Sequence, residues 1–310
     1  MADTQTLPSP IIIGLGRMGA NMARRLARGG FAVHGVDPSD AAHAALADEP
    51  RITTYATPQQ AIAAVHGPRI VWLMVAAGEI TDQTLTLLQG LLDKGDIVVD
   101  GGNANYLDSQ SRGERFKALG LHFVDCGVSG GVWGLDNGYC LMSGGEDAAI
   151  AALTPLFKCL APAADTGWLH CGPVGSGHFT KMIHNGIEYG MMQAYAEGFA
   201  LLAGNEKLGI DVAKVAELWR HGSVVRSWLL DLTASALQNP EDLQSIAPVV
   251  ADSGEGRWTI DESIRQGTPA PVIAASLMAR FSSQGKADMS NKLLSLMRKG
   301  FGGHAVVGKG

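Results

Sequence analysis

The chain has 310 residues, of which 46% are hydrophobic and 17% charged, and its formal net charge is −6. This composition is typical of a globular protein, and the absence of a long basic run argues against nucleic acid as a partner. No apolar run approaches the about 20 residues that a membrane-spanning helix needs, and the first ten residues lack the pattern of a signal peptide. We therefore expect a cytoplasmic protein that does not bind membranes. Its four cysteines show no CxxC or metal-ligand spacing and are expected to be reduced thiols.

Short apolar runs alternate with helical patterns in the first half of the chain. Amphipathic stretches at 17–28, 80–92 and 106–119 separate runs that are apolar enough for strands buried on both faces. This alternation predicts βαβ units in a mostly parallel sheet, and hence a Rossmann-like α/β domain over residues 1–173. The runs are "PIIIGLG", "FAVHGVD", "RIVWLMV", "DIVVDGG" and "LHFVDCG", followed by two further strand-like runs, "YCLMSGG" and "GWLHCG".

The pattern changes at the Gly/Pro-rich segment "CGPVGSG", which ends at Gly177. Every later periodic segment is typical of a helix, so residues 174–310 are predicted to form an all-α domain for substrate binding and oligomerisation. The glycine-rich stretch from residue 299 is predicted to be a tail. Helices are expected at 178–203, 212–221, 225–236, 258–266, 271–282 and 289–298.

The segment Gly14-Leu15-Gly16-Arg17-Met18-Gly19 follows the first predicted strand and opens the first predicted helix. This is the GxGxxG fingerprint of a dinucleotide site in the context that it requires. The first glycine makes the tight turn, the second admits the pyrophosphate, and the third packs helix on strand. The pyrophosphate would lie on the helix N-terminus, where Arg17 can assist. A glycine turn that binds nothing is the alternative.

An aspartate, Asp37, ends the second predicted strand at the distance expected for the acidic residue that binds the adenosine ribose. Its carboxylate would accept hydrogen bonds from the 2′-hydroxyl of NAD and would repel the 2′-phosphate of NADP. The next residues, 38–40, supply no cation for a phosphate. The sequence therefore predicts NAD as the coenzyme and disfavours NADP, whereas a solvated turn is the alternative reading of Asp37.

Three loops follow predicted strands at the edge where such sheets bind ligands. The loop "VAAG" contains Val75 and Ala76, which we expect to contact the coenzyme. The loop "DGGNANY" contains Asn103, whose amide can meet a substrate hydroxyl or the nicotinamide. The loop "DCGVSGGVWG" contains Ser129–Gly131, where a hydroxyl and successive backbone N–H groups suit a carboxylate. Taken singly, each of these loops is equally well explained as a simple turn.

The stretch "KMIHNGIEYG", from Lys181 to Gly190, places five polar side chains in an otherwise apolar helical segment. Small residues at every fourth position on the opposite side, beginning with Gly186 and Gly190, permit close helix packing. The segment is therefore predicted to be a buried helix whose polar stripe faces a cavity. A structural Lys–Glu pair on a solvated face is the alternative. On an α-helix the polar residues share one face: Lys181, His184, Asn185, Glu188 and Tyr189.

Four segments together resemble the decarboxylating 6-phosphogluconate dehydrogenase family in its short, NAD-preferring bacterial form. The resemblance extends from Ile11 to about His304, and its KxxHNxxEY core is specific. The wider β-hydroxyacid dehydrogenase superfamily shares the GxGxxG, the SGG loop and the helix lysine, but usually not His-Asn followed by Glu-Tyr. The segments are "GLGRMGANMARRL", "DGGNANY", "GVSGGVWG" and "GPVGSGHFTKMIHNGIEYGMMQAYAE".

The resemblance implies an oxidative decarboxylation of 6-phosphogluconate to ribulose 5-phosphate in the pentose phosphate pathway. Lys181 would take the proton from the substrate 3-hydroxyl as carbon 3 gives hydride to NAD. Glu188 would protonate carbon 1 of the enediol after CO2 leaves. We expect both side chains to be buried, because burial favours the uncharged lysine and the protonated glutamate that these roles require.

The resemblance also implies how the phosphorylated sugar acid is held. Tyr189 and Arg280 would bind the phosphate. Family members supply the Arg-x5-His pair near the C-terminus from a neighbouring subunit, which implies a homodimer or homotetramer with an intersubunit active site. The implied substrate residues are Asn103, Ser129, Gly130, Gly131, His184, Asn185, Tyr189, Arg280, Arg298 and His304.

Two features depart from the family pattern. Long members have a far larger helical domain, and members commonly place a lysine and a threonine in the loop that here contains Ser253, Glu255 and Arg257. An acidic residue there would repel a phosphate unless Arg257 compensates. The scattered histidines offer no ligand set, so no metal is expected. The alternative functions are a non-decarboxylating β-hydroxyacid dehydrogenase or reductase of the 3-hydroxyisobutyrate type and a catalytically silent NAD(H)-binding regulator.

Overall fold

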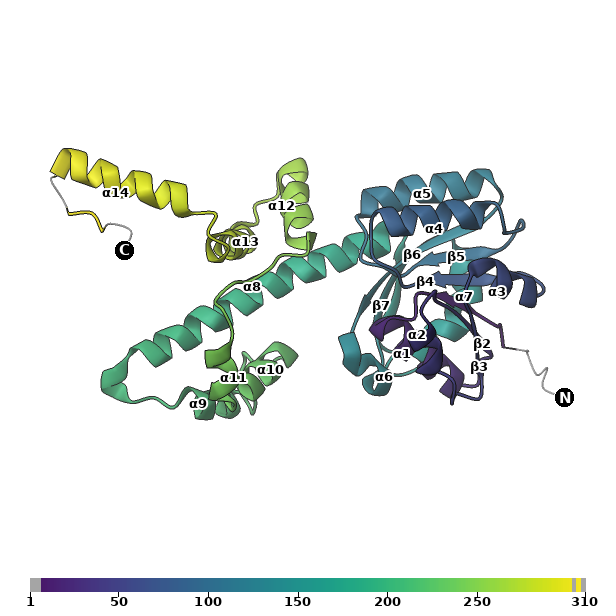
Figure 1. The fold of residues 1–310 in the computed structure, drawn as a ribbon, viewed down its shortest axis with the longest axis horizontal. Helices are drawn as coiled ribbons and strands as arrows, with labels where there is room; N and C mark the ends of the chain where they lie inside the picture. The colour runs from purple at the N-terminus through teal and green to yellow at the C-terminus, as the bar shows by residue number, and fades with distance from the viewer. Residues whose placement is uncertain (1–6, 303–304, 308–310) are drawn as a thin grey trace. The chain divides into compact units, whose positions relative to one another are not determined.

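The computed structural model describes residues 7–302 and 305–307. Two compact units, residues 1–181 and 182–310, divide the chain within one long helix, α8 (Ser176–Gly204), which Figure 1 shows as a continuous element. The boundary predicted between residues 173 and 174 lies just before this helix and stays a prediction.

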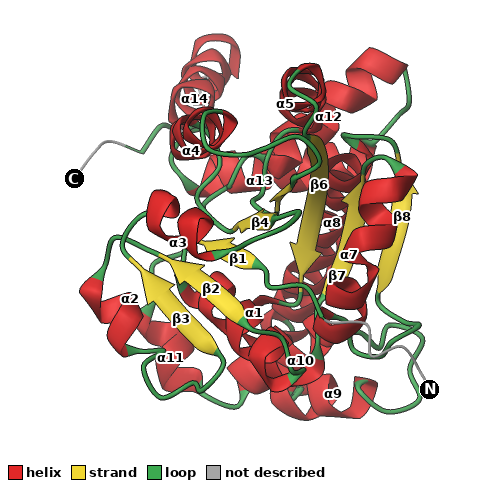
Figure 2. Cartoon of the chain, turned by 90° about the vertical axis from the view of Figure 1, so that its right-hand side faces the viewer, coloured by secondary structure: helices red, strands yellow, loops and turns green. Residues whose placement is uncertain are grey.

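The first unit contains an eight-stranded sheet covered by helices (Figure 2). Its strands are ordered β3-β2-β1-β4-β5-β6-β7-β8, and all neighbours run parallel except β6 and β7. The strand order reverses between β1 and β4, where such sheets leave a crevice for ligands at the carboxyl ends. In chain order the elements are β1 (Ile11–Ile13), α1 (Arg17–Arg28), β2 (Val33–Val36), α2 (Asp40–Ala44), β3 (Ile52–Tyr55), α3 (Pro58–Ala64), β4 (Ile70–Leu73), α4 (Glu79–Gln89), β5 (Ile97–Asp100), α5 (Tyr106–Ala118), β6 (His122–Ser129), η1 (Gly131–Trp133), α6 (Gly134–Asn137), β7 (Cys140–Gly144), α7 (Asp147–Leu160) and β8 (Trp168–Gly172).

Successive strand residues alternate between two apolar cores, one on each face of the sheet. Ile12 and Trp72 belong to the core shared with α1 and α7, whereas Ile11 and Val71 belong to the core shared with α3, α4 and α5. Because both faces are covered, every residue of β1 and β4 is buried. This is why these strands read as continuous apolar runs in the sequence.

Among its described residues, the second unit contains helices joined by loops and no strand. Its apolar cluster is small: Phe199 of α8 packs against Ala216 of α9 and against Leu230 and Ala234 of α10. Helix α12 packs on the part of α8 that belongs to the second unit, where Thr259 lies against Gly186. The elements after α8 are η2 (Glu206–Leu208), α9 (Val212–Trp219), α10 (Trp228–Leu237), α11 (Pro240–Ser245), α12 (Glu255–Gln266), α13 (Pro271–Ser283) and α14 (Asp288–Gly302).

The predicted α/β sheet followed by a helical region is confirmed, including the two added strands β7 and β8. The predictions omitted strand β3 and the helices α2, α3, α6, α7 and α11. Strand β3 is a partly exposed edge strand with two threonines, which gives a weak apolar signal, and α7 contains Pro155, a residue that normally breaks helices. The tail predicted from residue 299 is wrong in its first residues, because α14 continues to Gly302. A glycine costs a helix only about 1 kcal/mol and does not by itself end it.

Candidate active site

The GxGxxG loop joins β1 to α1 at the switch point of the sheet. Gly14 has φ +94°, and a Cβ on it would lie 2.6 Å from the carbonyl oxygen of Met74. A Cβ on Gly19 would overlap the carbonyl oxygen of Gly14. Gly16, by contrast, has no atom within 4 Å of its Cβ position, so the backbone there faces open space. The first and third glycines therefore build the turn, and the second leaves room for a ligand at the start of α1.

Asp37 follows β2 and has a structural role that the sequence did not reveal. Its Oδ2 accepts a hydrogen bond from the Leu15 N–H at 2.8 Å, and its Oδ1 accepts one from the Ser39 N–H at 2.9 Å. The carboxylate thus ties the end of β2 to the fingerprint loop. Each carboxylate oxygen has a second lone pair, so both retain the capacity to accept a bond from a ribose hydroxyl.

A buried ion pair holds the loop that carries Asn103. Asp100, at the end of β5, is fully buried; its Oδ2 lies 3.1 Å from Nη1 of Arg112, and its Oδ1 accepts a hydrogen bond from the Gly102 N–H at 3.2 Å. Arg112, itself 2% exposed, also binds Asp82 at 2.9 Å. Removing one partner of such a pair is costly, because a charge is left buried. The Asn103 side chain is exposed on this fixed loop.

The predicted carboxylate site, Ser129–Gly131, lies at the end of β6 and the start of η1. Gly130 has φ +126° and Gly131 has φ +53°, conformations that residues with a side chain rarely adopt. Ser129 is partly exposed and Gly131 is open to solvent. The loop after β4 is equally accessible: Val75 is partly exposed and Ala76 is exposed. These loops follow β4, β5 and β6 at one edge of the sheet, because the three strands are parallel.

Lys181 ends the first unit and lies against β6. A Cβ on Gly127 would overlap the Cβ of Lys181, so the stem of the lysine crosses this strand where it has no side chain. Gly177, one turn earlier, would clash in the same way with the carbonyl oxygens of Asp125 and Met142, each 2.5 Å away. Glycines on both elements therefore let α8 lie close on the sheet. Lys181 is 7% exposed, so the burial expected for this side chain is confirmed.

A buried aspartate caps the helix that carries Lys181. Asp125 of β6 accepts hydrogen bonds from the Gly175 N–H at 2.6 Å and the His178 N–H at 2.7 Å. Burial raises the pKa of this carboxyl group, while the charge of His178 and these backbone donors act in the opposite direction. The carboxylate satisfies backbone donors that the first turn of a helix leaves unpaired.

The rest of the polar stripe on α8 belongs to the second unit. His184 Nδ1 lies 3.1 Å from Asn185 Oδ1 and 3.9 Å from Glu188 Oε2. Asn185 is buried, but the side chains of His184 and Glu188 are each 40% exposed. The expected burial of Glu188 is therefore wrong for the single chain. Packing on the opposite side is confirmed at Gly186, whose Cβ position lies 2.8 Å from Thr259 of α12.

Tyr189 and Arg280, the predicted phosphate residues, lie together in the second unit. The Arg280 guanidinium carbon is 3.5 Å from the centre of the Tyr189 ring, and its Nη1 donates to the Ala251 carbonyl at 2.7 Å. The Tyr189 hydroxyl accepts a hydrogen bond from the Ser253 N–H at 3.2 Å. The Ser253 loop, which the family pattern also associates with the phosphate, therefore contacts Tyr189 directly.

The charged residues of this loop find their partners within the loop itself. Glu255 is 4% exposed and its Oε2 accepts a hydrogen bond from the Ser253 hydroxyl at 2.5 Å, so it does not face solvent as a free anion. Arg257 forms a two-point ion pair with Asp252, at 2.7 and 3.0 Å, which raises the pKa of the guanidinium. Because Arg257 is already paired with Asp252, a bound phosphate would have to compete with Asp252 for the charge of Arg257.

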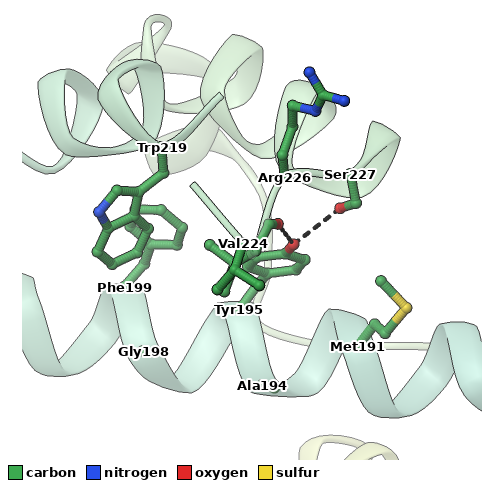
Figure 3. A pocket seen from close by; sticks show the side chains of 10 residues that line it. Met191, Ala194, Tyr195, Gly198, Phe199, Trp219, Val224, Arg226 and Ser227 are labelled. Atoms are coloured by element: carbon green, nitrogen blue, oxygen red, sulfur yellow. Dashed lines mark hydrogen bonds between the residues drawn. The ribbon is translucent and has the colours of Figure 1, made fainter. Parts of the chain in front are cut away.

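Two parts of the second unit lie apart from these residues. Arg298 is exposed on α14, and its predicted partner His304 lies outside the described residues. An apolar pocket with a volume of about 390 Å³ lies beside the second half of α8, between Tyr195, Phe199 and Trp219 (Figure 3). None of the predicted site residues lines it.

Within each unit the structure brings a subset of the predicted residues together. The first unit groups the fingerprint, Asn103, Ser129–Gly131 and Lys181 around the carboxyl ends of its strands, and the second groups Tyr189 with Arg280. The buried groups that position these residues were not predicted from the sequence. An aspartate inside the apolar run "LHFVDCG" was a signal for Asp125, because buried charges need partners. Arg112 lies in a charged helical segment, which gave no such signal.

Two family models match consecutive parts of the chain. Residues 11–172 match the model described as the NAD binding domain of 6-phosphogluconate dehydrogenase, and residues 177–304 match that of its C-terminal domain. A relative from Haloferax volcanii, named as an NAD(+)-dependent, decarboxylating 6-phosphogluconate dehydrogenase, is 41% identical over 303 residues. This match covers 96% of this chain and 98% of the relative.

Two solved structures are also similar to this chain. Plasmodium falciparum 6-phosphogluconate dehydrogenase is 28% identical, with a TM-score of 0.83; the match covers 97% of this chain but 66% of that longer chain. A 3-hydroxyisobutyrate dehydrogenase from Mycobacterium tuberculosis, 21% identical with a TM-score of 0.71, covers 91% of this chain and 94% of its own, and shows a shared fold alone. The resemblance drawn from the sequence is thus confirmed, and the chain belongs to the 6-phosphogluconate dehydrogenase family.

Proposed function

We propose that the protein catalyses the NAD-dependent oxidative decarboxylation of 6-phosphogluconate to ribulose 5-phosphate and CO2. The observation that carries this proposal is the placement of Lys181, covered and docked on Gly127 of β6, two residues before the Ser129–Gly131 loop. A base beside a carboxylate site and a dinucleotide loop suits the oxidation of a hydroxy acid. Glu188, seven residues further along the same helix, supplies the acid that a decarboxylation needs.

In the proposed reaction Lys181 acts from its neutral form. Its amine takes the proton of the 3-hydroxyl, and bound NAD would accept the hydride from carbon 3. The resulting ketone takes up the electron pair released as the bond to CO2 breaks, and Lys181 returns a proton to the carbonyl oxygen. Glu188 then protonates the product's carbon 1 while Lys181 regains the proton of the hydroxyl, so the products are the pentulose phosphate, CO2 and NADH.

One assay tests this proposal. The protein is mixed with 6-phosphogluconate and either NAD or NADP, and reduced coenzyme and CO2 are both followed. Equal amounts of NADH and CO2 are expected, with less activity from NADP and no effect of EDTA, because no metal is invoked. Reduction without CO2 would favour a non-decarboxylating β-hydroxyacid dehydrogenase, and no reaction with either coenzyme would favour the silent NAD(H)-binding regulator.

The coenzyme preference is tested at Asp37. Replacing Asp37 with Ser and Pro38 with Arg is expected to lower kcat/KM for NAD and raise it for NADP, because a 2′-phosphate gains a cation and loses a repulsive charge. Some loss with both coenzymes is also expected, since the Leu15 N–H loses its acceptor. Steady-state kinetics with both coenzymes measure the shift. Asp40→Ser is the matched control, and an unmodified protein that already prefers NADP would contradict the assignment.

We further propose that the enzyme is a homodimer or homotetramer in which Arg298 and His304 act in the neighbouring subunit's site. Support comes from α14: every described side chain from 288 to 300 is exposed, including Met289, Leu294 and Leu296. An amphipathic helix with a solvated apolar face is typical of an unfilled interface.

None of the described helices is long and apolar enough to cross a membrane, and the predicted cytoplasmic location stays a prediction.

A mixing experiment tests the shared site. Lys181→Met and Arg298→Ala are each expected to have little kcat/KM for 6-phosphogluconate. Unfolding and refolding the two variants together should restore about a quarter of the wild-type value. Half of randomly formed dimers are mixed, and each mixed dimer has one intact site and one inactive site. Light scattering measures the oligomeric state. If the mixture stays as inactive as its parts, Arg298 acts within its own chain, and a fully active Arg298→Ala protein would show that it does not act at all.

A further inference from the structure

A buried polar cluster lies under the first turn of α8, beside the residues assigned above. Ser109 of α5 and Asp125 of β6 are fully buried, and His178 of α8 is 1% exposed. Asp125 binds the backbone of α8, as described, and His178 Nδ1 lies 2.7 Å from the Ser109 hydroxyl oxygen. This Ser109–His178 bond is therefore a side-chain link between α5 and α8.

The histidine is not explained by packing. Its other ring nitrogen, Nε2, is buried and finds no hydrogen-bond partner among the described residues. Leaving a buried polar atom unsatisfied destabilises the fold, and a leucine or phenylalanine of similar size would avoid this cost. The useful part of His178 is therefore Nδ1, the atom that meets Ser109.

The bond joins the two segments that carry the proposed chemistry. On one side, the Ser109 hydroxyl lies 3.3 Å from the Asn105 carbonyl, and Asn105 caps α5 two residues after Asn103. On the other side, Lys181 follows His178 by one helical turn. The rings of Tyr106 and Phe179 meet edge to face at 5.1 Å between the same two first turns. The hydrogen bond thus sets the register between the Asn103 loop and Lys181.

We propose that His178 is a positioning residue, which fixes Lys181 relative to the Asn103 loop through its Nδ1 bond to Ser109. The inference rests on the proposed function, in which the two segments act on one substrate. A displacement of about 1 Å between reacting groups can lower turnover about a hundredfold. The bond is therefore expected to affect kcat more than coenzyme affinity, because the groups predicted to hold the pyrophosphate and the adenosine ribose of NAD lie on other elements.

The test uses four variants: His178→Leu, Ser109→Ala, the double variant that combines these two changes, and His178→Asn. The asparagine restores a polar atom near the Nδ1 position. Each of the first two is expected to lower kcat about tenfold or more, with the KM for NAD changed less than twofold. The double variant should be no worse than either single variant, because both remove the same bond. His178→Asn should recover most of the activity. Ser176→Ala, which removes a buried hydroxyl without a described partner on the same turn, is the matched control.

A merely structural role predicts a different result: a lower melting temperature with kcat unchanged, or losses that multiply in the double variant, and either outcome overturns the proposal. Ser109→Ala keeps the test decisive if His178→Leu does not fold. A second readout does not need turnover. The rate at which reductive methylation labels Lys181, followed by mass spectrometry, should change in His178→Leu and Ser109→Ala but not in Ser176→Ala. An inactive wild-type protein would refute the proposed function, whereas unchanged labelling would refute the positioning role.

Discussion

Lys181→Met is expected to lower kcat for 6-phosphogluconate oxidation by about 10²–10⁴-fold, the range over which a positioned general base contributes. Methionine keeps the apolar stem that lies on Gly127, so the fold and the affinity for NAD should be retained. The measurement is steady-state NADH production, with a coenzyme titration by fluorescence as the second readout.

Two further variants define the role of this lysine. Lys181→Arg keeps the charge but cannot act as a base, so it should be as inactive as Lys181→Met. Lys117→Met removes an exposed lysine of α5, whose side chain is 78% exposed, and should leave turnover unchanged. If the arginine variant retained most of the activity, Lys181 would act by its charge and the proposed proton transfer would be wrong.

Glu188→Gln is expected to lower steady-state turnover by about 10²–10⁴-fold for a different reason, since the glutamate acts after hydride transfer. Glutamine keeps the size and the contacts of the side chain but cannot give up a proton to carbon. Rapid mixing should therefore show a burst of NADH close to one per active site, followed by slow turnover. The burst separates the two steps, because Lys181→Met should show none.

The control for this variant lies on the same helix. Glu197→Gln changes an exposed glutamate of α8 that accepts a hydrogen bond from Gln193, and it should leave both phases unchanged. A Glu188→Gln protein that showed no burst and bound NAD weakly would place the glutamate in coenzyme binding instead.

The exposure of Glu188 shows that helical spacing predicts which face a residue lies on but does not predict whether that face is buried. The stripe of polar residues on α8 was visible in the sequence, because helical periodicity puts positions three, four and seven apart on one face. Burial of that face depends on what packs against it, and this is not a property of the helix. In the single chain Lys181 is 7% exposed and the side chain of Glu188 is 40% exposed, although helical spacing places both residues on the same face of α8.

The sequence by itself determined the class of the fold and predicted which groups react. Strands buried on both faces leave apolar runs, a pyrophosphate turn needs glycines at fixed spacing, and KxxHNxxEY marks one face of one helix. Each of these signals is local, so a short stretch of chain contains it whole.

Only the tertiary structure decided how these groups are held. Asp37 binds the fingerprint loop, Asp100 pairs with Arg112, and His178 meets Ser109, in pairs that are 12 to 69 residues apart. Partners so distant share no periodicity that a sequence could display. They meet because the strand order of the sheet brings their elements together, and burial then requires that each polar group find a partner.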